Sequence, residues 1–477
     1  MSHVTSLTIA SGRPLLGPQT DSAPRGSASV RRDMLDRLLS GPIIPTLLKL
    51  AAPTIIVLVV QTFVSVIETY YVSFLGTDAL AGVALVFPVL MLMTMVSNGG
   101  IGGGVASAIA RALGGGRGSD ADALVLHAVV LAILFGLVFS IGVLGGGTAL
   151  FSALGGSRTA IQAALQYSSF VFGGAVFIWI VNLLAAALRG AGDVKTPAIV
   201  ILAGAVIVVP ASPALIFGFG PVPQLGIAGA GVAVATYYLF ATLTLVAYMR
   251  SARSPVRLVW SRLEWRLFKD ILGVGALSAI GAAQLNLTVA VITALVGAFG
   301  TNALAGYGLA SRLDYLLIPL QFALGTATVI MVGANVGAGQ TARARQIAWT
   351  AALIAAAVTE TVGILAALFP QVWIGIFSSD PEVLARGANY LQLVGPFYGF
   401  VGLGMLLYFA GQGAKRVTWP VLAGTARLII AAVGGWVAVK IYAANLPTLF
   451  AVISASSIAF GGLIALATHL QRWGDKQ

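Results

Sequence analysis

Twelve apolar runs constrain this chain most, because each is long enough to cross a bilayer. A helix needs about 20 mostly apolar residues to cross the ~30 Å hydrocarbon core, where every backbone polar group must be paired within the protein. Of the 477 residues, 58% are hydrophobic and 9% charged, against about 25% charged in soluble domains. The runs lie near residues 45–75, 79–110, 121–146, 165–188, 196–219, 225–249, 268–299, 303–336, 346–370, 387–410, 418–441 and 447–470. We therefore predict an all-α polytopic membrane protein with twelve transmembrane helices.

The two halves of the chain repeat each other. Residues Gly76–Gly82 read GTDALAG, and Gly300–Gly306 read GTNALAG 224 positions later. A second pair of segments is 223 positions apart, Ala187–Ala191 (ALRGA) and Ala410–Ala414 (AGQGA). The same shift of 223 relates Gln61 to Gln284 and Tyr167 to Tyr390.

Each half holds six of the predicted helices, so both halves enter the membrane in the same orientation. The sequence therefore predicts two pseudo-symmetric six-helix bundles, a parallel repeat whose axis lies along the membrane normal. Two similar bodies in one membrane suggest a transporter, since a substrate path can run between bodies that rock against each other.

The net charge of +12 follows the expected topology. If both termini are cytoplasmic, the outer loops hold only Arg158, Arg386 and Lys440, and the basic clusters fall on the inner side. This is the positive-inside pattern, and it predicts a multi-pass protein of the plasma (inner) membrane with both termini cytoplasmic. Because orientation explains the basicity, we expect no nucleic-acid partner.

The expected organisation is two lobes flanked by tails. The first 30 residues are rich in Ser, Gly, Pro and Arg and contain no apolar signal-peptide core, a composition typical of disorder. Trp260 and Trp265 of the polar linker are expected at the headgroup level. The predicted segments are a cytoplasmic, largely disordered tail (1–41), an N-lobe (42–250), a cytoplasmic lobe linker (251–266), a C-lobe (267–472) and a cytoplasmic tail (473–477).

A glycine run in the second helix, Asn98–Gly104 (NGGIGGG), predicts close helix packing. Neither G-x-G-x-x-G nor G-x-x-x-x-G-K fits the run, so it is not a nucleotide-binding loop. Glycines spaced by four, such as Gly100 and Gly104, let helices approach closely or let a helix bend.

Five charged side chains fall deep inside predicted spans, where each costs roughly 3 kcal/mol and is a candidate functional residue. They are Glu68, Arg312, Asp314, Glu360 and Arg427. The four in the second half have charges that sum to zero. Because Arg312 and Asp314 are two residues apart and point to different helix faces, we expect cross-helix pairs such as Arg312 with Glu360 or Asp314 with Arg427. These charges form either a buried structural network or a proton or substrate relay.

Glu68 has no basic counterpart in its own half. A desolvated carboxylate can bind and release a proton, which is what a proton-coupled carrier needs. Gln61, Ser65 and Glu68 follow spacings of four and three, so they line one helix face. We assign proton or cation coupling to Glu68, Gln61 and Asn182. A substrate cavity or charge network is assigned to the remaining polar candidates: Ser65, Thr69, Asn98, Gln284, Asn286, Arg312, Asp314, Glu360 and Arg427.

The chain offers few residues that could carry out catalysis or bind a metal. It contains no cysteine, and its three histidines, His3, His127 and His469, are not clustered with acids. We expect no enzymatic activity, no metal site and no cofactor.

The chain resembles the multidrug and toxic compound extrusion (MATE) family, most closely its DinF-like branch, from about residue 42 to 470. Several segments carry the resemblance: Leu48–Pro53, Gln61–Glu68 and Gly76–Ala81; Leu188–Asp193 with Lys195–Pro197; Leu215–Gly220 with Gly226–Ala230; and Ala305–Arg312. The resemblance implies a V-shaped pair of bundles of the MATE/MOP type and antiport of drugs or other organic solutes against protons or sodium.

Departures from the family pattern concern the coupling ion. Many members carry Asp where this chain has Glu68, and well-defined DinF-like sites carry Asn and Asp where this chain has Val208 and Ser212. Asn182 matches a polar site residue of the family. The acids of helices seven and ten in the NorM-like branch are missing, and helix seven offers only Gln284 and Asn286. With few oxygen ligands, Na⁺ would be poorly coordinated, so proton coupling is favoured.

The sequence thus predicts a monomeric, proton-coupled efflux antiporter for small, lipophilic, cationic substrates, with membrane lipids as its surroundings. The alternative is a flippase for a lipid-linked precursor, in which Arg312 and Arg427 would meet an anionic headgroup. The major facilitator class also has parallel six-helix halves, but Arg111–Asp122 lacks its acidic and basic loop motif.

Overall fold

A computed structural model describes residues 25–221, 223–471 and 473, and all its regular elements are helical. Within these residues, eleven helices are long and apolar enough to cross a membrane. Helices α6 (Arg158–Gly173) and α7 (Ala175–Gly190) together form a further candidate span, bent by 48°. With the bent pair taken as one span, the predicted twelve-helix, all-α fold is confirmed.

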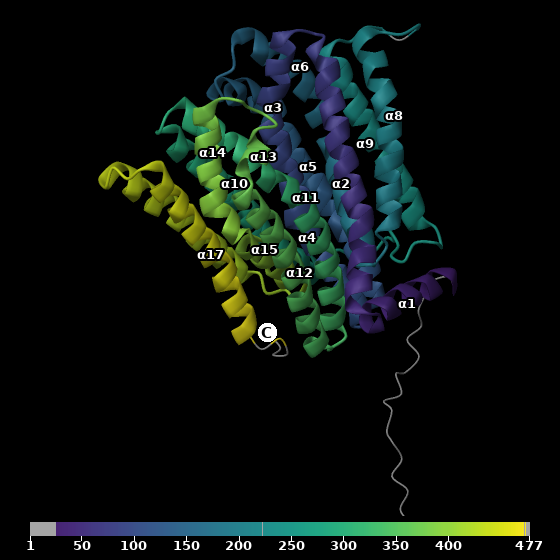
Figure 1. The fold of residues 1–477 in the computed structure, drawn as a ribbon. Coiled ribbons are helices and arrows are strands. Elements are labelled where there is room, and N and C mark those ends of the chain that lie inside the picture. Colours follow the sequence, from purple (N-terminus) through teal and green to yellow (C-terminus); the bar gives the residue numbers. More distant parts are fainter. Residues whose placement is uncertain (1–24, 222, 472, 474–477) are drawn as a thin grey trace, which may run out of the picture.

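The helices form two successive bundles (Figure 1). Besides α6 and α7, the first bundle contains α2 (Ile43–Ser73), α3 (Thr77–Met95), π-helical η1 (Val96–Ile101), α4 (Gly102–Gly114), α5 (Gly118–Ala153), α8 (Lys195–Phe217) and α9 (Ile227–Arg250). The second contains α10 (Trp265–Gly297), α11 (Thr301–Gly337), α12 (Thr341–Leu368), α13 (Pro370–Ile374), α14 (Pro381–Val394), η2 (Gly395–Phe397), α15 (Tyr398–Gly413), α16 (Thr418–Ile429), η3 (Ile430–Gly434), η4 (Val437–Ile441) and α17 (Leu446–Leu470).

The prediction of a disordered tail is wrong for residues 25–40, which form helix α1 (Arg25–Ser40). Leu35, Leu38 and Leu39 lie on one stripe of this helix and pack on the core, which is why the segment folds against the protein. Helix α1 contacts both bundles: Arg31 pairs with Asp122 of α5 at 2.9 Å, and the Leu38 carbonyl accepts a hydrogen bond from Asn335 of α11 at 3.0 Å. The rest of the predicted tail, residues 1–24, lies outside the described residues.

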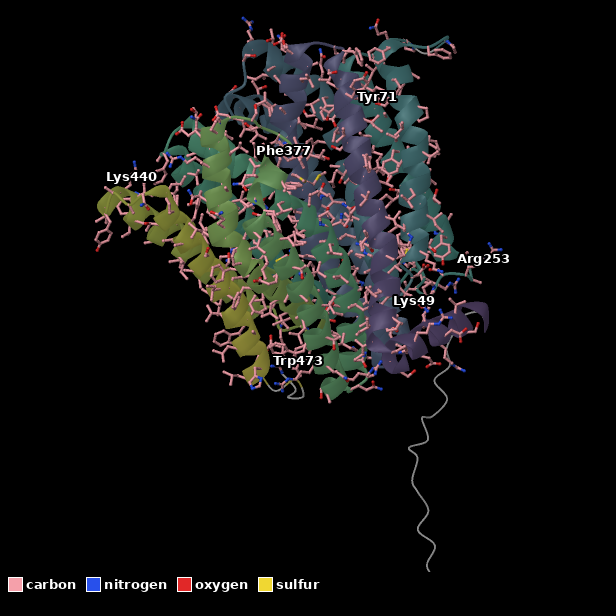
Figure 2. All side chains as sticks on the ribbon, viewed as in Figure 1. Lys49, Tyr71, Arg253, Phe377, Lys440 and Trp473 are labelled. Carbon is pink, nitrogen blue, oxygen red and sulfur yellow. The ribbon has the colours of Figure 1, made fainter. Side chains whose placement is uncertain are left out.

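The bundles meet at one face of the molecule and diverge toward the other (Figure 1). We call the first the basic face; it carries α1, the α4–α5 and α15–α16 turns and residues 251–264. Figure 2 shows Lys49 and Arg253 near this face and Tyr71 and Lys440 away from it. The basic face is therefore where the two bundles are joined.

Glycines of the NGGIGGG run lie at the junction between the bundles. A Cβ built on Gly104 would overlap the Ile271 carbonyl oxygen of α10 and would lie 2.9 Å from the Gly275 nitrogen. A Cβ on Gly100 would lie 3.1 Å from the Ala279 Cβ. Only glycine permits this approach, so the packing role predicted for the run is confirmed.

Candidate functional site

Glu68 lies on α2 in the first bundle, away from the junction. Its side chain is half-buried, and its Oε1 is buried with no hydrogen-bond partner in the described part of the chain. The Ser212 hydroxyl of α8 lies near the carboxyl group but has no hydrogen-bond partner among the described residues, and the Tyr167 phenol of α6 is within electrostatic reach. Both neighbours are buried, with exposed fractions of 0% and 8%. Helices α2, α6 and α8 thus enclose one acid among few polar groups.

The other residues predicted around Glu68 on its own helix do not join it. Gln61, Ser65 and Thr69 are exposed on α2. The Thr69 hydroxyl donates to the Ser65 carbonyl at 2.8 Å, within the same helix. None of the hydrogen bonds between described residues connects these side chains to Glu68.

The predicted asparagines of the second and fourth spans are bonded elsewhere. Asn182 is buried on α7, and its Nδ2 donates to the Ser97 hydroxyl of η1 at 2.8 Å. Asn98 Oδ1 accepts from Arg189 of α7 at 3.3 Å. Both asparagines thus hold the π-helical segment against α7, which is a positioning role.

A second, half-buried acid lies in the second bundle. Asp314 of α11 accepts a hydrogen bond from the Tyr390 hydroxyl of α14 at 2.8 Å. Tyr307, Tyr398 and Arg427 interact electrostatically with the same carboxylate. Its Oδ1 is buried and has no hydrogen-bond partner among the described residues.

Neither predicted cross-helix pair forms a close ion pair in the second bundle, and Asp314 and Arg427 interact only at longer electrostatic range. Within the described residues, no ion pair at 4.0 Å or less joins Arg312 to Glu360 or Asp314 to Arg427. Glu360 instead accepts from the Gly399 amide at 2.6 Å, because the helical break before α15 leaves backbone N–H groups in need of an acceptor.

Both arginines lie over aromatic rings, and neither makes an ion pair with a carboxylate among the described residues. Arg312 is exposed and its guanidinium lies 5.2 Å from the centre of the Phe377 ring. Arg427 lies 5.3 Å from the centre of the Phe460 ring. The quadrupole of an aromatic ring attracts a cation, so these contacts compensate part of the cost of placing a guanidinium inside the bundle.

The remaining candidates lie on α10, near the junction. Gln284 Nε2 donates to the Thr425 hydroxyl of α16 at 2.7 Å. Asn286 is exposed, and its Nδ2 donates to the Ala282 carbonyl at 2.9 Å and contacts Met95 Sδ at 3.1 Å. Asn286 therefore belongs to the contact between bundles rather than to either acid.

A tyrosine accompanies each acid, and neither tyrosine was among the site residues predicted from the sequence. Tyr167 lies within electrostatic reach of Glu68 in the first bundle, and its repeat-related counterpart Tyr390 bonds Asp314 in the second. The shift of 223 between the two tyrosines was the available signal. The acids themselves are not repeat-related, because Glu68 comes from α2 and Asp314 from α11.

Two helical bundles that join at one face, each with a half-buried acid and together spanning a membrane, define a multi-pass membrane transporter built on a repeat. The chain belongs to the MATE family, since the family model MatE matches residues 53–214 and 278–437. The two matches begin 225 residues apart and fall in the two bundles, in agreement with the duplication.

Several transporters of this family are similar to the chain. An FAD transporter of Shewanella oneidensis is 29% identical over 406 residues, which cover 83% of this chain and 88% of that protein. The probable multidrug resistance protein YoeA of Bacillus subtilis is 25% identical over 72% of this chain and 76% of its own length. The probable multidrug resistance protein NorM of Thermotoga maritima is also 25% identical, over 79% of this chain and 81% of that protein.

Solved structures share the fold. A MATE transporter in its bent conformation superposes with a TM-score of 0.83 at 22% identity, covering 94% of this chain and 97% of that one. A MOP superfamily transporter from Pyrococcus furiosus gives a TM-score of 0.81 at 23% identity, covering 94% of this chain and 98% of that one. The likeness shows that the chain shares the fold of these transporters.

Proposed function

We propose that this MATE protein exports organic solutes by antiport against protons, with Glu68 as the coupling group. The observation that supports this most is the Glu68 carboxylate, which is buried at Oε1 without a hydrogen-bond partner in the described chain. No described cation lies within 4.0 Å of it to form an ion pair. A buried, unpaired carboxylate is costly, and binding of a proton removes that cost.

The surroundings of Glu68 favour a proton over a sodium ion. A hard cation that has lost its water needs several oxygen ligands at once. The polar side chains that influence the Glu68 carboxylate are Ser212, which lies near it without a hydrogen bond, and Tyr167 at electrostatic range. Val208, one helical turn before Ser212, has no oxygen on its side chain. A single carboxylate with one hydroxyl suits a proton, which needs only one acceptor atom.

The distribution of basic residues supports a cytoplasmic position for the basic face. In that orientation, the bundles are joined on the cytoplasmic side and diverge toward the outside (Figure 1). Rocking of the bundles would then open the cytoplasmic side and close the outer one. Coupling requires that the proton and the substrate each bind one of the two states more tightly than the other state.

Small, lipophilic, cationic solutes are the proposed substrates, in line with the multidrug resistance proteins among the relatives. A neutral and an ionised form of Glu68 differ by one charge, so the ionised form would hold a cation better. Protonation would then release it.

A second candidate substrate is FAD, because a relative that covers most of the chain is an FAD transporter. FAD carries a pyrophosphate, which guanidinium groups bind well. Arg312 is exposed on α11 and is not engaged in an ion pair within the described residues, so it is available for such an anion.

The proposal is tested in proteoliposomes with ΔpH and ΔpNa imposed separately, using ethidium as the lipophilic cation and FAD as the anion. We expect ΔpH alone to drive wild-type transport and Glu68→Gln to abolish it. Glu382→Gln is the matched control, because it makes the same change at an exposed glutamate.

Transport by Glu68→Gln at the wild-type rate under ΔpH would refute the role of Glu68. Transport driven by ΔpNa alone would refute proton coupling. The choice between ethidium and FAD decides the substrate class and leaves the coupling test unaffected.

A further inference from the structure

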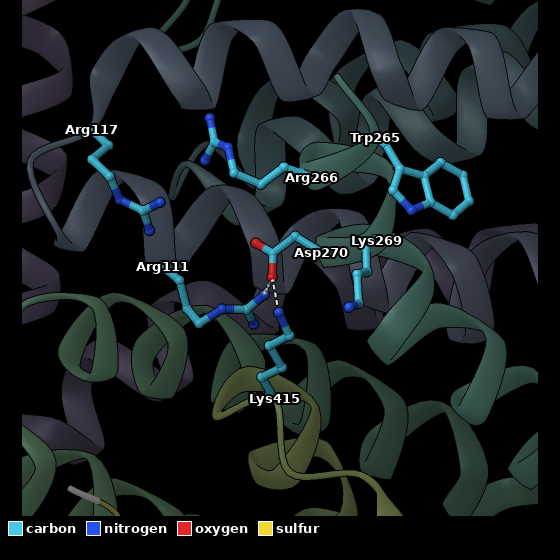
Figure 3. Close-up of a pocket in the computed structure, with 7 residues that line it drawn as sticks. All are labelled: Arg111, Arg117, Trp265, Arg266, Lys269, Asp270 and Lys415. Atoms are coloured by element: carbon cyan, nitrogen blue, oxygen red, sulfur yellow. Dashed lines mark hydrogen bonds and ion pairs between the residues drawn. The ribbon is translucent and has the colours of Figure 1, made fainter. Parts of the chain in front are cut away.

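A cavity of ≈ 620 Å³ lies at the basic face and is lined by residues of both bundles (Figure 3), and neither Glu68 nor Asp314 is among them. Five cationic side chains line it: Arg111, Arg117, Arg266, Lys269 and Lys415. The remaining lining residues are Asp270 and Trp265. None of these residues takes part in the proposed coupling at Glu68.

Asp270 lies at the centre of the cavity wall and is shared by cations from both sides. It accepts from Arg111 of α4 at 3.1 Å and from Lys415 of the α15–α16 turn at 2.5 Å. Arg111 is 9% exposed and belongs to the first bundle, whereas Asp270 belongs to α10 of the second. One ion pair at the cavity therefore bridges the bundles.

The other cations are only partly neutralised. Arg117 and Arg266 share Asp120, at 3.2 Å and 3.0 Å, and Arg266 also contacts Glu264 at 3.2 Å. Lys269 is exposed and makes no ion pair or hydrogen bond with the described residues. Five cations thus face three carboxylates, which leaves two positive charges in excess around one cavity.

Two exposed tryptophans lie in or beside the cavity. Trp265, in its lining, is 73% exposed, and Trp260 of the preceding segment is 95% exposed. Exposed tryptophans next to cations are typical of the membrane–water interface. Basic pockets between transmembrane helices at such an interface bind phospholipid head groups.

We propose that this cavity binds a phosphate-bearing anion, from an anionic phospholipid headgroup or from free phosphate. Lys269, which has no partner among the described residues, and the two arginines that share Asp120 supply the charge. Because the lining comes from both bundles, the complete site exists only while they are joined at the basic face. The bound anion stabilises the joined state, since a ligand favours the conformation it binds better.

Binding is measured by native mass spectrometry of the full chain titrated with phosphatidylglycerol, with phosphatidylcholine as the neutral comparison. Lys269→Gln removes a cation that no described residue pairs with, so folding is unaffected. Lys49→Gln makes the same change at an exposed lysine near the basic face but outside the cavity (Figure 2). We expect Lys269→Gln to weaken phosphatidylglycerol binding about fivefold, from the interaction of one lysine with anionic lipid, and Lys49→Gln to leave it unchanged.

The effect on the junction is measured by spin-label distances, since the chain has no native cysteine. Ala252→Cys, in the turn directly after α9 of the first bundle, and Ala342→Cys, on α12 of the second, place labels on exposed positions. In phosphatidylcholine nanodiscs, either added phosphatidylglycerol or inorganic phosphate should raise the short-distance population. A response to lipid alone identifies the headgroup as the source, and a response to phosphate alone identifies the free anion. Absence of both responses would overturn the proposal, and equal lipid binding by Lys269→Gln and wild type would rule out the lipid headgroup as the source of the anion.

Discussion

Replacing Gly104 with alanine tests whether the glycine run joins the bundles at the basic face. In the structure, a Cβ at this position would overlap the Ile271 carbonyl oxygen and would lie 2.9 Å from the Gly275 nitrogen. Both atoms belong to the backbone of α10 and cannot rotate away. The substitution therefore forces α4 and α10 apart.

The expected shift in the conformational equilibrium follows from the overlap between the added Cβ and the α10 backbone. Added atoms in a well-packed contact cost ~1–3 kcal/mol, and here the cost falls only on the state in which the bundles are joined at the basic face. The equilibrium should therefore shift about 5- to 150-fold toward a state that is open at that face. Helix propensity favours Ala over Gly in both states, so it cancels from the difference.

The measurement is the distance between spin labels at Ala252→Cys and Ala342→Cys, taken by double electron–electron resonance. Gly99→Ala is the matched control on the same span, because its Cβ would meet only the Phe322 ring at 3.7 Å. We expect Gly104→Ala to lengthen the distance and Gly99→Ala to leave it unchanged. The reasoning fails if Gly104→Ala keeps the wild-type distribution, or if both variants shift it equally.

Three further substitutions separate structural from transport roles. Asp314→Asn retains an acceptor for Tyr390, so it should cost less than about 1.5 kcal/mol of stability and keep ΔpH-driven transport; loss of transport at unchanged Tm would make Asp314 a coupling group. Asp270→Asn removes the carboxylate that bridges the bundles. It should destabilise the state in which the bundles are joined by about 2 kcal/mol, less than the ~3–5 kcal/mol for fully buried pairs, because the Asp270 side chain is 22% exposed. Unchanged spin-label distances would contradict this expectation. Ser97→Ala leaves buried Asn182 without its acceptor and should cost ~1–3 kcal/mol, so an unchanged Tm would show that the bond is dispensable.

The positions of the spans could be predicted because the signal is local. The predicted run at 268–299 agrees with α10 (Trp265–Gly297), and that at 447–470 agrees with α17 (Leu446–Leu470). Each follows from the length of one apolar run, which does not depend on the neighbouring helices. Helix α1 was missed because its apolar stripe is short and the surrounding composition is polar.

The partners of the charged residues could not be predicted in the same way. Glu360 was expected to pair with Arg312, but it accepts from the Gly399 amide at 2.6 Å. The sequence does not show that η2 interrupts the span just before Gly399 and leaves the Gly399 amide without a partner inside its own helix. Asn182 was expected near Glu68 and instead bonds Ser97 of η1.

The class of fold, the repeat and the glycine contact follow from the amino-acid sequence alone. These depend on composition, on a constant shift between halves and on spacing along one helix, all of which are properties of neighbouring or repeated residues. The surroundings of each acid, the place where the bundles join and the cations that line the basic cavity depend instead on how the helices pack in three dimensions. Those contacts depend on how far each helix is rotated, tilted and broken relative to the next, and small changes in rotation replace one partner with another.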